Sequence, residues 1–230
     1  MGYLREKYTK EYYLGHRVND NNQLVPVGYG AMGFDEFLSN KVPAHMLRIL
    51  TQVNFERKNV LDIGFGRGES LTYATLQGAK RCVGIDFSEQ AIVLARQFMK
   101  AMKVRPAILV CSDALEMLPY IHSGGEDIVI MFDVIEHLPK EEALMILHHV
   151  NRVLNVDGML LINTPFYGVD EDIIAQKGVY IAPSPTDLIP ETKGMHCNKF
   201  TEQRFYETLN SCGFVKTENP HIFTKRKGGE

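Results

Sequence analysis

The sequence predicts an α/β protein built on a mostly parallel sheet. From about residue 59, short apolar runs alternate with longer helical patterns, which is typical of repeated strand and helix units. The runs are continuously apolar, as expected for strands buried on both faces. The length of 230 residues suits one domain with a sizeable core.

Seven strands are predicted, and five of them are apolar runs within the alternating region. These five are Asn59 to Ile63, Arg81 to Ile85, Ala107 to Cys111, Asp127 to Phe132 and Met159 to Asn163. The remaining two form a pair within residues 214–227, interrupted at Asn219-Pro220.

Helical patterns separate the runs, and local signals mark several helix ends. Ser88 is the predicted N-cap of one helix, and Gly78, Gly158 and Gly213 are predicted to follow helix ends. The connection from residue 112 to residue 125 is expected to hold only a short helix. The predicted helices are Pro43 to Val53, Glu69 to Gln77, Ser88 to Met102, Lys140 to Leu154 and Thr201 to Ser211.

We expect residues 1–230 to form a single domain with four parts. Residues 1–42 are an arm rich in Tyr and Gly, and residues 43–164 are the core. Residues 165–198 contain four prolines and no sustained period, so they are predicted to form a lid. Residues 199–230 hold the last helix and the strand pair.

Composition excludes several classes of protein. Hydrophobic residues make up 45% and charged residues 23%, which argues against a disordered or a membrane chain. A net charge of −3 disfavours a nucleic-acid partner. No apolar run is long enough for a secretory leader or a membrane span, so a cytoplasmic location with reduced cysteines is expected. The oligomeric state is not predicted.

The stretch "LDIGFGRGES" places three alternate glycines directly after the first predicted strand. The dinucleotide fingerprint G-x-G-x-x-G needs a glycine where this chain has Glu69. No phosphate-binding P-loop motif occurs. The turn therefore favours a ligand other than a dinucleotide or a nucleoside triphosphate.

Acidic side chains lie in or just beyond the predicted strands, at the edge where ligands bind in such sheets. They would repel a pyrophosphate and suit a cationic ligand. S-adenosylmethionine carries a sulfonium and an ammonium and has no phosphate, so Asp62 suits its cationic end and Asp86 its ribose hydroxyls. The acidic residues are Asp62, Asp86, Asp113, Asp133 and Glu136.

Six motifs together resemble class I S-adenosylmethionine-dependent methyltransferases over about residues 59–214. They are "VLDIGFGRGES", "VGIDFS", "CSDALEMLP", "DIVIMFDVIEHLPKEE", "LNVDGMLLINTPF" and "HCNKFTEQRFYETLNSCGF". The "DVIEHL" and "HxxKFT" segments most resemble the subgroup that includes the ubiquinone-biosynthesis O-methyltransferases and many small-molecule and sugar methyltransferases. The resemblance implies a Rossmann-like, seven-stranded, mostly parallel sheet with helices on both faces and an antiparallel last strand.

The same resemblance implies which residues contact the cofactor. Asp86 would hold the ribose, Phe87 would lie along the adenine, and Asp113 would accept the adenine amino group, with the Ala114 N–H near a ring nitrogen. The other expected cofactor residues are Asp62, Gly64, Phe65, Gly66, Gly68, Ser112, Phe132 and Asp133. Phe65 departs from the family pattern, which usually has Cys or Ser there.

Two histidines are candidate catalytic residues. His137 follows the fourth strand near the expected position of the reacting methyl, and His196 closes the predicted lid. Either could instead serve packing or cofactor contact. Glu136 with these histidines could hold a divalent ion, but no ligand spacing requires it, so no metal is expected.

Further histidines and tyrosines have weaker functional interpretations. His148 and His149 are expected on a solvated or half-buried helix face, with a metal site as the alternative. Tyr8, Tyr12 and Tyr13 are expected to serve packing, with closure of the cofactor pocket as the alternative.

We therefore predict methyl transfer from S-adenosylmethionine to an oxygen, nitrogen or carbon of a small molecule, with oxygen favoured and S-adenosylhomocysteine as the by-product. The alternatives are a non-catalytic S-adenosylmethionine-binding module, an NAD-dependent oxidoreductase, and a protein or nucleic-acid methyltransferase.

Overall fold

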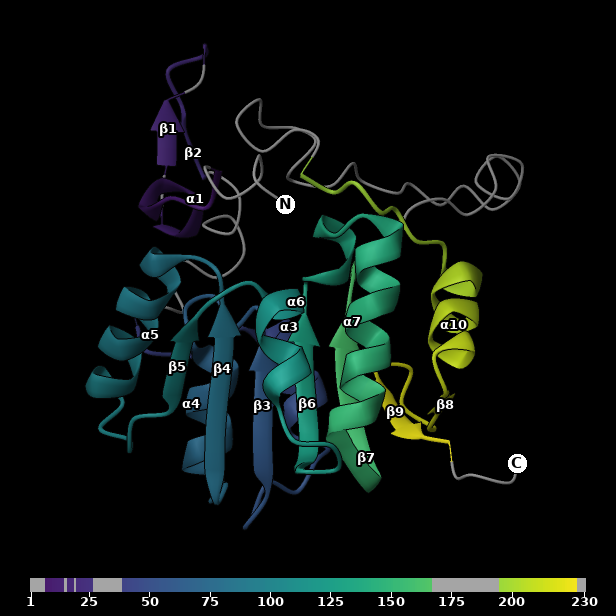
Figure 1. Cartoon of the computed structure of the whole chain (residues 1–230). Helices are drawn as coiled ribbons and strands as arrows, with labels where there is room; N and C mark the ends of the chain where they lie inside the picture. The colour runs from purple at the N-terminus through teal and green to yellow at the C-terminus, as the bar shows by residue number, and fades with distance from the viewer. Residues whose placement is uncertain (1–6, 15, 19, 27–38, 167–194, 227–230) are drawn as a thin grey trace.

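The computed structural model of the chain describes residues 7–14, 16–18, 20–26, 39–166 and 195–226. These residues form a central sheet of seven strands with helices on both faces (Figure 1). This architecture confirms the predicted α/β fold.

The strand order places the first core strand, β3, inside the sheet between β4 and β6. The order is β5-β4-β3-β6-β7-β9-β8. Strands β3 to β7 pair in parallel, whereas β9 pairs antiparallel with both β7 and β8. The strand direction therefore matches the prediction. The bounds are β3 Asn59–Ile63, β4 Arg81–Asp86, β5 Ile108–Cys111, β6 Glu126–Phe132, β7 Leu154–Asn163, β8 Phe214–Lys216 and β9 Ile222–Lys225.

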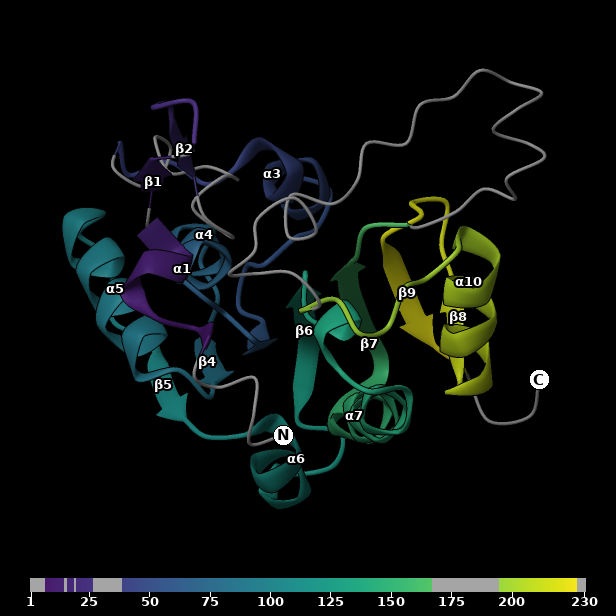
Figure 2. The same ribbon diagram turned by 90° about the horizontal axis from the view of Figure 1, so that it is seen from above.

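Alternate residues of the central strands pack into two separate hydrophobic cores, one on each face of the sheet. Val60 of β3 belongs to one core and Leu61 to the other, because successive strand residues point to opposite faces. Both cores exclude water, which is why these strands are apolar throughout. The view from above shows the two helical layers (Figure 2). One holds α3 Ala44–Leu50, α4 Glu69–Leu76 and α5 Glu89–Ala101, and the other holds α6 Ala114–Met117, α7 Lys140–Val153 and α10 Glu202–Ser211.

Most predicted helix ends are confirmed, and one is wrong. Ser88 caps α5 by accepting a hydrogen bond from the Ala91 N–H at 3.4 Å. Gly78 and Gly213 follow helices with φ of 82° and 84°. Gly158 does not end a helix, since it lies inside β7. Helix α7 ends at Val153, and the extended backbone of Leu154 leads directly into the strand, so no left-handed residue is needed.

Two shorter segments complete the described core. The predicted short helix between β5 and β6 is α6, followed by the 3₁₀ turn η3 Leu118–Tyr120. A second 3₁₀ turn, η4 Ile135–His137, follows β6.

The N-terminal arm contains a helix and two strands that the sequence does not predict. Helix α1 Lys10–Leu14 precedes an antiparallel pair, β1 His16–Val18 and β2 Leu24–Pro26. Strands of three residues are too short to show a period. In both views α1 lies beyond the carboxyl ends of the core strands (Figures 1 and 2). Residues 167–194, most of the predicted lid, lie outside the described residues, so the lid and the division of the chain into parts stay predictions.

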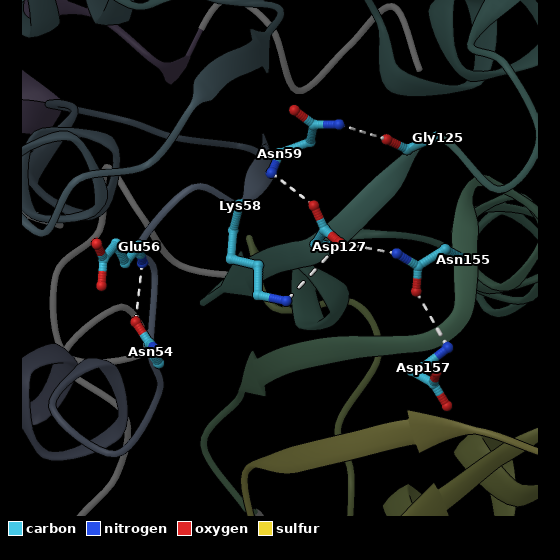
Figure 3. Close-up of polar contacts among 8 residues, drawn as sticks. All are labelled: Asn54, Glu56, Lys58, Asn59, Gly125, Asp127, Asn155 and Asp157. Carbon is cyan, nitrogen blue, oxygen red and sulfur yellow. Dashed lines mark hydrogen bonds and ion pairs between the residues drawn. The ribbon is translucent and has the colours of Figure 1, made fainter.

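A polar network ties strands together at the opposite edge of the sheet (Figure 3). The Asp127 carboxylate accepts from the Asn59 N–H and from the Asn155 amide, each at 2.8 Å, and pairs with Lys58 at 3.9 Å. These contacts join the start of β6 to β3 and β7.

Among the described residues, the structure contains no helix with the length and apolar character needed to cross a membrane.

Candidate functional site

The site lies at the carboxyl edge of the sheet, where strand order reverses between β3 and β6. It starts with the turn that joins β3 to α4. Its three glycines, Gly64, Gly66 and Gly68, have φ of 70°, 54° and 82°, which glycine adopts without a steric penalty.

The three glycines serve different purposes. A Cβ on Gly64 would approach Val134 Cγ2 to 2.5 Å, and one on Gly68 would approach Ala95 Cβ to 2.7 Å. A Cβ on Gly66 would have a Tyr13 ring carbon as its nearest neighbour, at 3.7 Å, which is an ordinary contact distance. Gly68 therefore allows α4 to pack against α5, whereas Gly66 lines the cavity next to Tyr13.

Phe65 fits because β4 has a glycine behind it. A Cβ at Gly84 would lie 2.5 Å from Phe65 Cδ1, so the ring occupies space that only a glycine leaves free. Phe65 is 4% exposed and also lines the cavity of the site. The unusual residue is thus accommodated by the neighbouring strand.

Asp86, at the end of β4, is held by backbone hydrogen bonds. One carboxylate oxygen accepts from the Gly66 N–H at 3.0 Å and the other from the Ser88 N–H at 2.9 Å. Burial raises the pKa of Asp86 to about 6, although both hydrogen bonds oppose the rise. The carboxylate is fixed in place and linked directly to the glycine turn.

Asp62 is a second buried carboxylate on the neighbouring strand. It accepts a short hydrogen bond from the Ser70 hydroxyl of α4. Burial raises the pKa of Asp62 to about 7; the Ser70 bond lowers it, and the charge of Asp86 raises it further. Two buried carboxyl groups with raised pKa values in one cavity mark a candidate functional site.

A cavity of about 80 Å³ brings most of the predicted residues together. Cofactor pockets commonly measure about 300–1,000 Å³, so this cavity is narrow. The predicted residues along it are Asp62, Gly64, Phe65, Gly66, Asp86, Phe87, Phe132, Asp133 and His137. Gly68, Ser112, Asp113, Ala114 and His196 are not among its lining residues.

The residues after β5 that are predicted to contact the adenine make hydrogen bonds within the protein. Asp113 caps α6 by accepting from the Leu115 N–H at 2.9 Å, and the Ser112 N–H donates to the Asp86 carbonyl at 3.0 Å. Asp113 therefore acts as the N-cap of α6 in the structure. A role in adenine binding stays a prediction.

Three tyrosines of the arm narrow the cavity. Tyr8, Tyr12 and Tyr13 all line it, and the Tyr8 ring lies 4.8 Å from the Phe87 ring in an edge-on contact. The Ser88 hydroxyl donates to the Tyr8 carbonyl at 3.1 Å. Burial raises the pKa of Tyr8 well above its usual range, so its hydroxyl stays protonated. The tyrosine spacing is the only sequence signal for this contact with the cavity, and by itself it favours packing.

Four further lining residues had no signal in the sequence. They are Met46, Ser70, Val134 and Leu138.

Asp133 directly follows β6 in a strained, left-handed conformation. Its φ is 54°, which is uncommon outside glycine. Its side chain accepts from the Asn163 amide at 2.8 Å, and its other oxygen lies 3.5 Å from His45 Nε2. Such strain is often found at functional sites, and this residue borders the cavity.

The two candidate catalytic histidines lie side by side. The His137 and His196 rings have centroids 4.5 Å apart and are nearly perpendicular. Burial lowers the pKa of His137 to about 3, and His196 lowers it further, so the ring is neutral. Glu136 is buried next to them, which raises the pKa of its carboxyl well above the usual range.

A family model described as a methyltransferase domain matches residues 60–158. The matched segment contains the glycine turn, Asp62, Asp86 and His137. The match favours methyl transfer over the oxidoreductase alternative and supports S-adenosylmethionine as the cofactor.

Known proteins are similar to this chain at low identity. A carboxy-S-adenosyl-L-methionine synthase from Glaesserella parasuis serovar 5 (strain SH0165) is 23% identical over 151 residues. The alignment covers 61% of this chain and 61% of that relative's length.

Two solved structures share the fold. A SAM dependent methyltransferase from Archaeoglobus fulgidus has a TM-score of 0.58 at 22% identity, over 78% of this chain and 69% of that one. A putative methyltransferase from Bacillus halodurans C-125 has a TM-score of 0.61 at 21% identity, over 76% and 71%. At these identities the two structures show that the fold is shared, and the match to the methyltransferase domain model over residues 60–158 supports an S-adenosylmethionine-dependent methyltransferase.

Proposed function

We propose that this protein transfers the methyl group of S-adenosylmethionine to a small molecule, with oxygen as the favoured acceptor atom. The observation that carries the proposal is the single small cavity that Asp62, Asp86, Gly66 and His137 line together. The first three suit the cofactor, and an imidazole at the same opening suits an acceptor hydroxyl.

In this proposal the cofactor lies across the ends of β3 and β4. Asp86 accepts from the ribose hydroxyls with its remaining lone pairs, and Asp62 faces the cationic methionine end. Phe87 lies along the adenine. The narrow cavity favours a small acceptor over a macromolecule.

The methyl transfer itself is an in-line displacement. The bond from sulfur to the methyl carbon breaks as the bond from the acceptor oxygen forms, which leaves S-adenosylhomocysteine. The hydroxyl proton passes to His137 or His196. The neutral ring of His137 has a lone pair for it, but a low pKa makes the ring a weak base, so positioning carries much of the rate.

Calorimetric titration with S-adenosylhomocysteine, and NAD as the parallel ligand, tests the cofactor assignment. We expect S-adenosylhomocysteine to bind and NAD not to bind. Turnover is then tested by following S-adenosylhomocysteine formation with a panel of phenolic, carboxylic and amine acceptors. Binding of NAD alone would overturn the proposal, and binding without turnover on every acceptor would favour the non-catalytic module.

A second candidate is chemistry on S-adenosylmethionine itself, supported by the similarity to the carboxy-S-adenosyl-L-methionine synthase. Mass spectrometry of the ligand released from purified protein, after incubation with S-adenosylmethionine, distinguishes the two. A carboxylated cofactor would favour this candidate, and S-adenosylhomocysteine would favour methyl transfer.

A further inference from the structure

Three side chains with metal-binding atoms converge at the rim of the cavity. Glu136 and His137 are adjacent in η4, whereas His196 comes from a segment almost sixty positions later. One possible ligand atom from each residue lies within 4.8 Å of the other two. Within the described parts of the chain, this is the one group of three such side chains that meets this spacing.

Two of the three side chains are each oriented by an additional hydrogen-bonding contact. His137 Nδ1 lies 3.2 Å from the Met195 carbonyl, which favours the tautomer with its lone pair on Nε2. One Glu136 oxygen accepts from the Thr164 hydroxyl at 2.9 Å. Metal ligands in proteins are typically oriented in this way.

The backbone also ties the two segments together. The Asn198 N–H donates to the Glu136 carbonyl at 3.0 Å, so the segment that carries His196 is fixed against η4. Convergence of the three side chains is therefore built into the fold at this point.

The other carboxylate oxygen of Glu136 is a buried acceptor that no described group satisfies. Glu136 is 1% exposed, and its Oε1 atom is buried without a hydrogen-bond partner. A buried acceptor without a partner is costly and is uncommon in folded proteins. A cation bound by this oxygen would remove that cost.

We propose that Glu136, His137 and His196 bind a divalent transition-metal cation. Two imidazoles and one carboxylate suit ions such as Mn²⁺, Co²⁺ or Zn²⁺ better than Mg²⁺ or Ca²⁺, which prefer oxygen ligands. The sequence alone predicts no metal, because spacing along the chain does not bring residue 196 to residues 136 and 137.

The cation would have coordination positions left for an acceptor. His137 lines the cavity together with Phe132 and Asp133, so the ion would face the end where the methyl is delivered. This part of the inference rests on the proposed function. It assigns the acceptor as a molecule with a hydroxyl or carboxylate oxygen that coordinates the ion, which lowers the pKa of a bound hydroxyl. With both imidazoles bound to the ion, the hydroxyl proton passes to water, and the histidines accept it only where no ion is bound.

The described geometry is slightly more open than a metal-bound site. Ligand atoms about 2.1 Å from a common ion lie at most about 4.2 Å apart. The spacing of 4.8 Å therefore requires only small side-chain rotations to reach bonding distance.

The first test measures Co²⁺ binding to the full chain by equilibrium dialysis and visible absorption. We expect one equivalent for the wild type, and binding weakened at least tenfold in Glu136→Gln and His196→Ala. His148→Ala, which removes an exposed histidine of α7, should bind like the wild type. Should His196→Ala not fold, the isosteric Glu136→Gln decides.

A parallel titration with S-adenosylhomocysteine separates the two proposals. Absence of stoichiometric Co²⁺ binding, or equal binding by Glu136→Gln and the wild type, would overturn the metal site even where S-adenosylhomocysteine binds. Stoichiometric Co²⁺ binding that Glu136→Gln weakens, without S-adenosylhomocysteine binding, would support the metal site and overturn the proposed function instead.

Discussion

At the scale of single residues, the site depends on carboxylates that the fold keeps out of water. Asp62 and Asp86 are 2% and 6% exposed, and burial raises the pKa of each. Folding thus places acidic groups where their ionised form is costly until a cationic or hydroxyl-rich ligand arrives. Hydrogen bonds from Ser70, Ser88 and Gly66 hold them in position.

Replacing Asp86 tests its role in cofactor binding. We expect Asp86→Ala to bind S-adenosylhomocysteine about 10-fold to 100-fold more weakly, because hydrogen bonds to a charged group contribute about 1.5–3 kcal/mol. Asp113→Ala serves as the comparison, since Asp113 caps α6. Loss of a cap should cost about 1 kcal/mol of stability. An equally large loss of affinity in Asp113→Ala would instead support its predicted contact with adenine.

Raised pKa values also predict how stability depends on pH. The folded state keeps the Asp62 proton up to about pH 7, whereas the unfolded chain loses it near pH 4. This group therefore stabilises the ligand-free protein at low pH, and that contribution is lost as the pH rises from about 4 to 7. Urea unfolding of wild type and Asp62→Asn at pH 5 to 8 should show the variant gaining relative stability as the pH rises. A constant difference would contradict the buried, protonated Asp62.

At the scale of elements, the turn between β3 and α4 combines packing with ligand contact. Gly68 sits at the N-cap position of α4, in the left-handed conformation, with Ala95 of α5 directly against it. Gly66 lies two residues earlier and faces the cavity. One short motif therefore meets two requirements: close packing of α4 against α5 at Gly68 and access of the backbone to the cavity at Gly66.

Alanine at each position should separate these constraints. Gly68→Ala introduces a clash and a strained φ, so we expect a loss of about 2–4 kcal/mol in the free energy of unfolding. Its folded fraction should still bind S-adenosylhomocysteine. Gly66→Ala should cost about 1–2 kcal/mol in stability and weaken binding as well. Denaturant unfolding with calorimetry measures both, and the reverse pattern would contradict these roles.

At the scale of the whole molecule, the two ends of the sheet differ in function: one carries the candidate site and the other a stabilising polar network. The carboxyl edge carries the cavity, covered by tyrosines of the arm, and the amino edge carries the network around Asp127 (Figure 3). Because that network lies at the far end of the strands, stability and ligand binding can be perturbed separately.

Asp127→Ala tests this separation. The change leaves the Asn59 N–H without its acceptor, so we expect about 1–3 kcal/mol of destabilisation with unchanged S-adenosylhomocysteine affinity. Lys58→Ala removes only a half-exposed pair at 3.9 Å and should cost less than about 1 kcal/mol. A change in affinity in Asp127→Ala would show that the two edges are coupled.

The sequence by itself determined the strands and helices of the core, because apolar period and capping residues act within a few positions. β3 matches its predicted bounds, and Ser88 caps α5 as expected. The glycine turn with its carboxylates also indicated the cofactor class. Gly158 misled the prediction, because a glycine after a helical pattern can equally lie in the strand that follows.

Only the tertiary structure decided which distant residues meet. Contact of Tyr8 with Phe87, of Gly68 with Ala95, and of Glu136 and His137 with His196 depends on chain paths that no local period records. The assignments around Asp113 show the same limit, since a carboxylate after a strand can cap a helix or face a ligand. Local forces specify elements, whereas the packing of elements over the sheet selects the side chains that share the site.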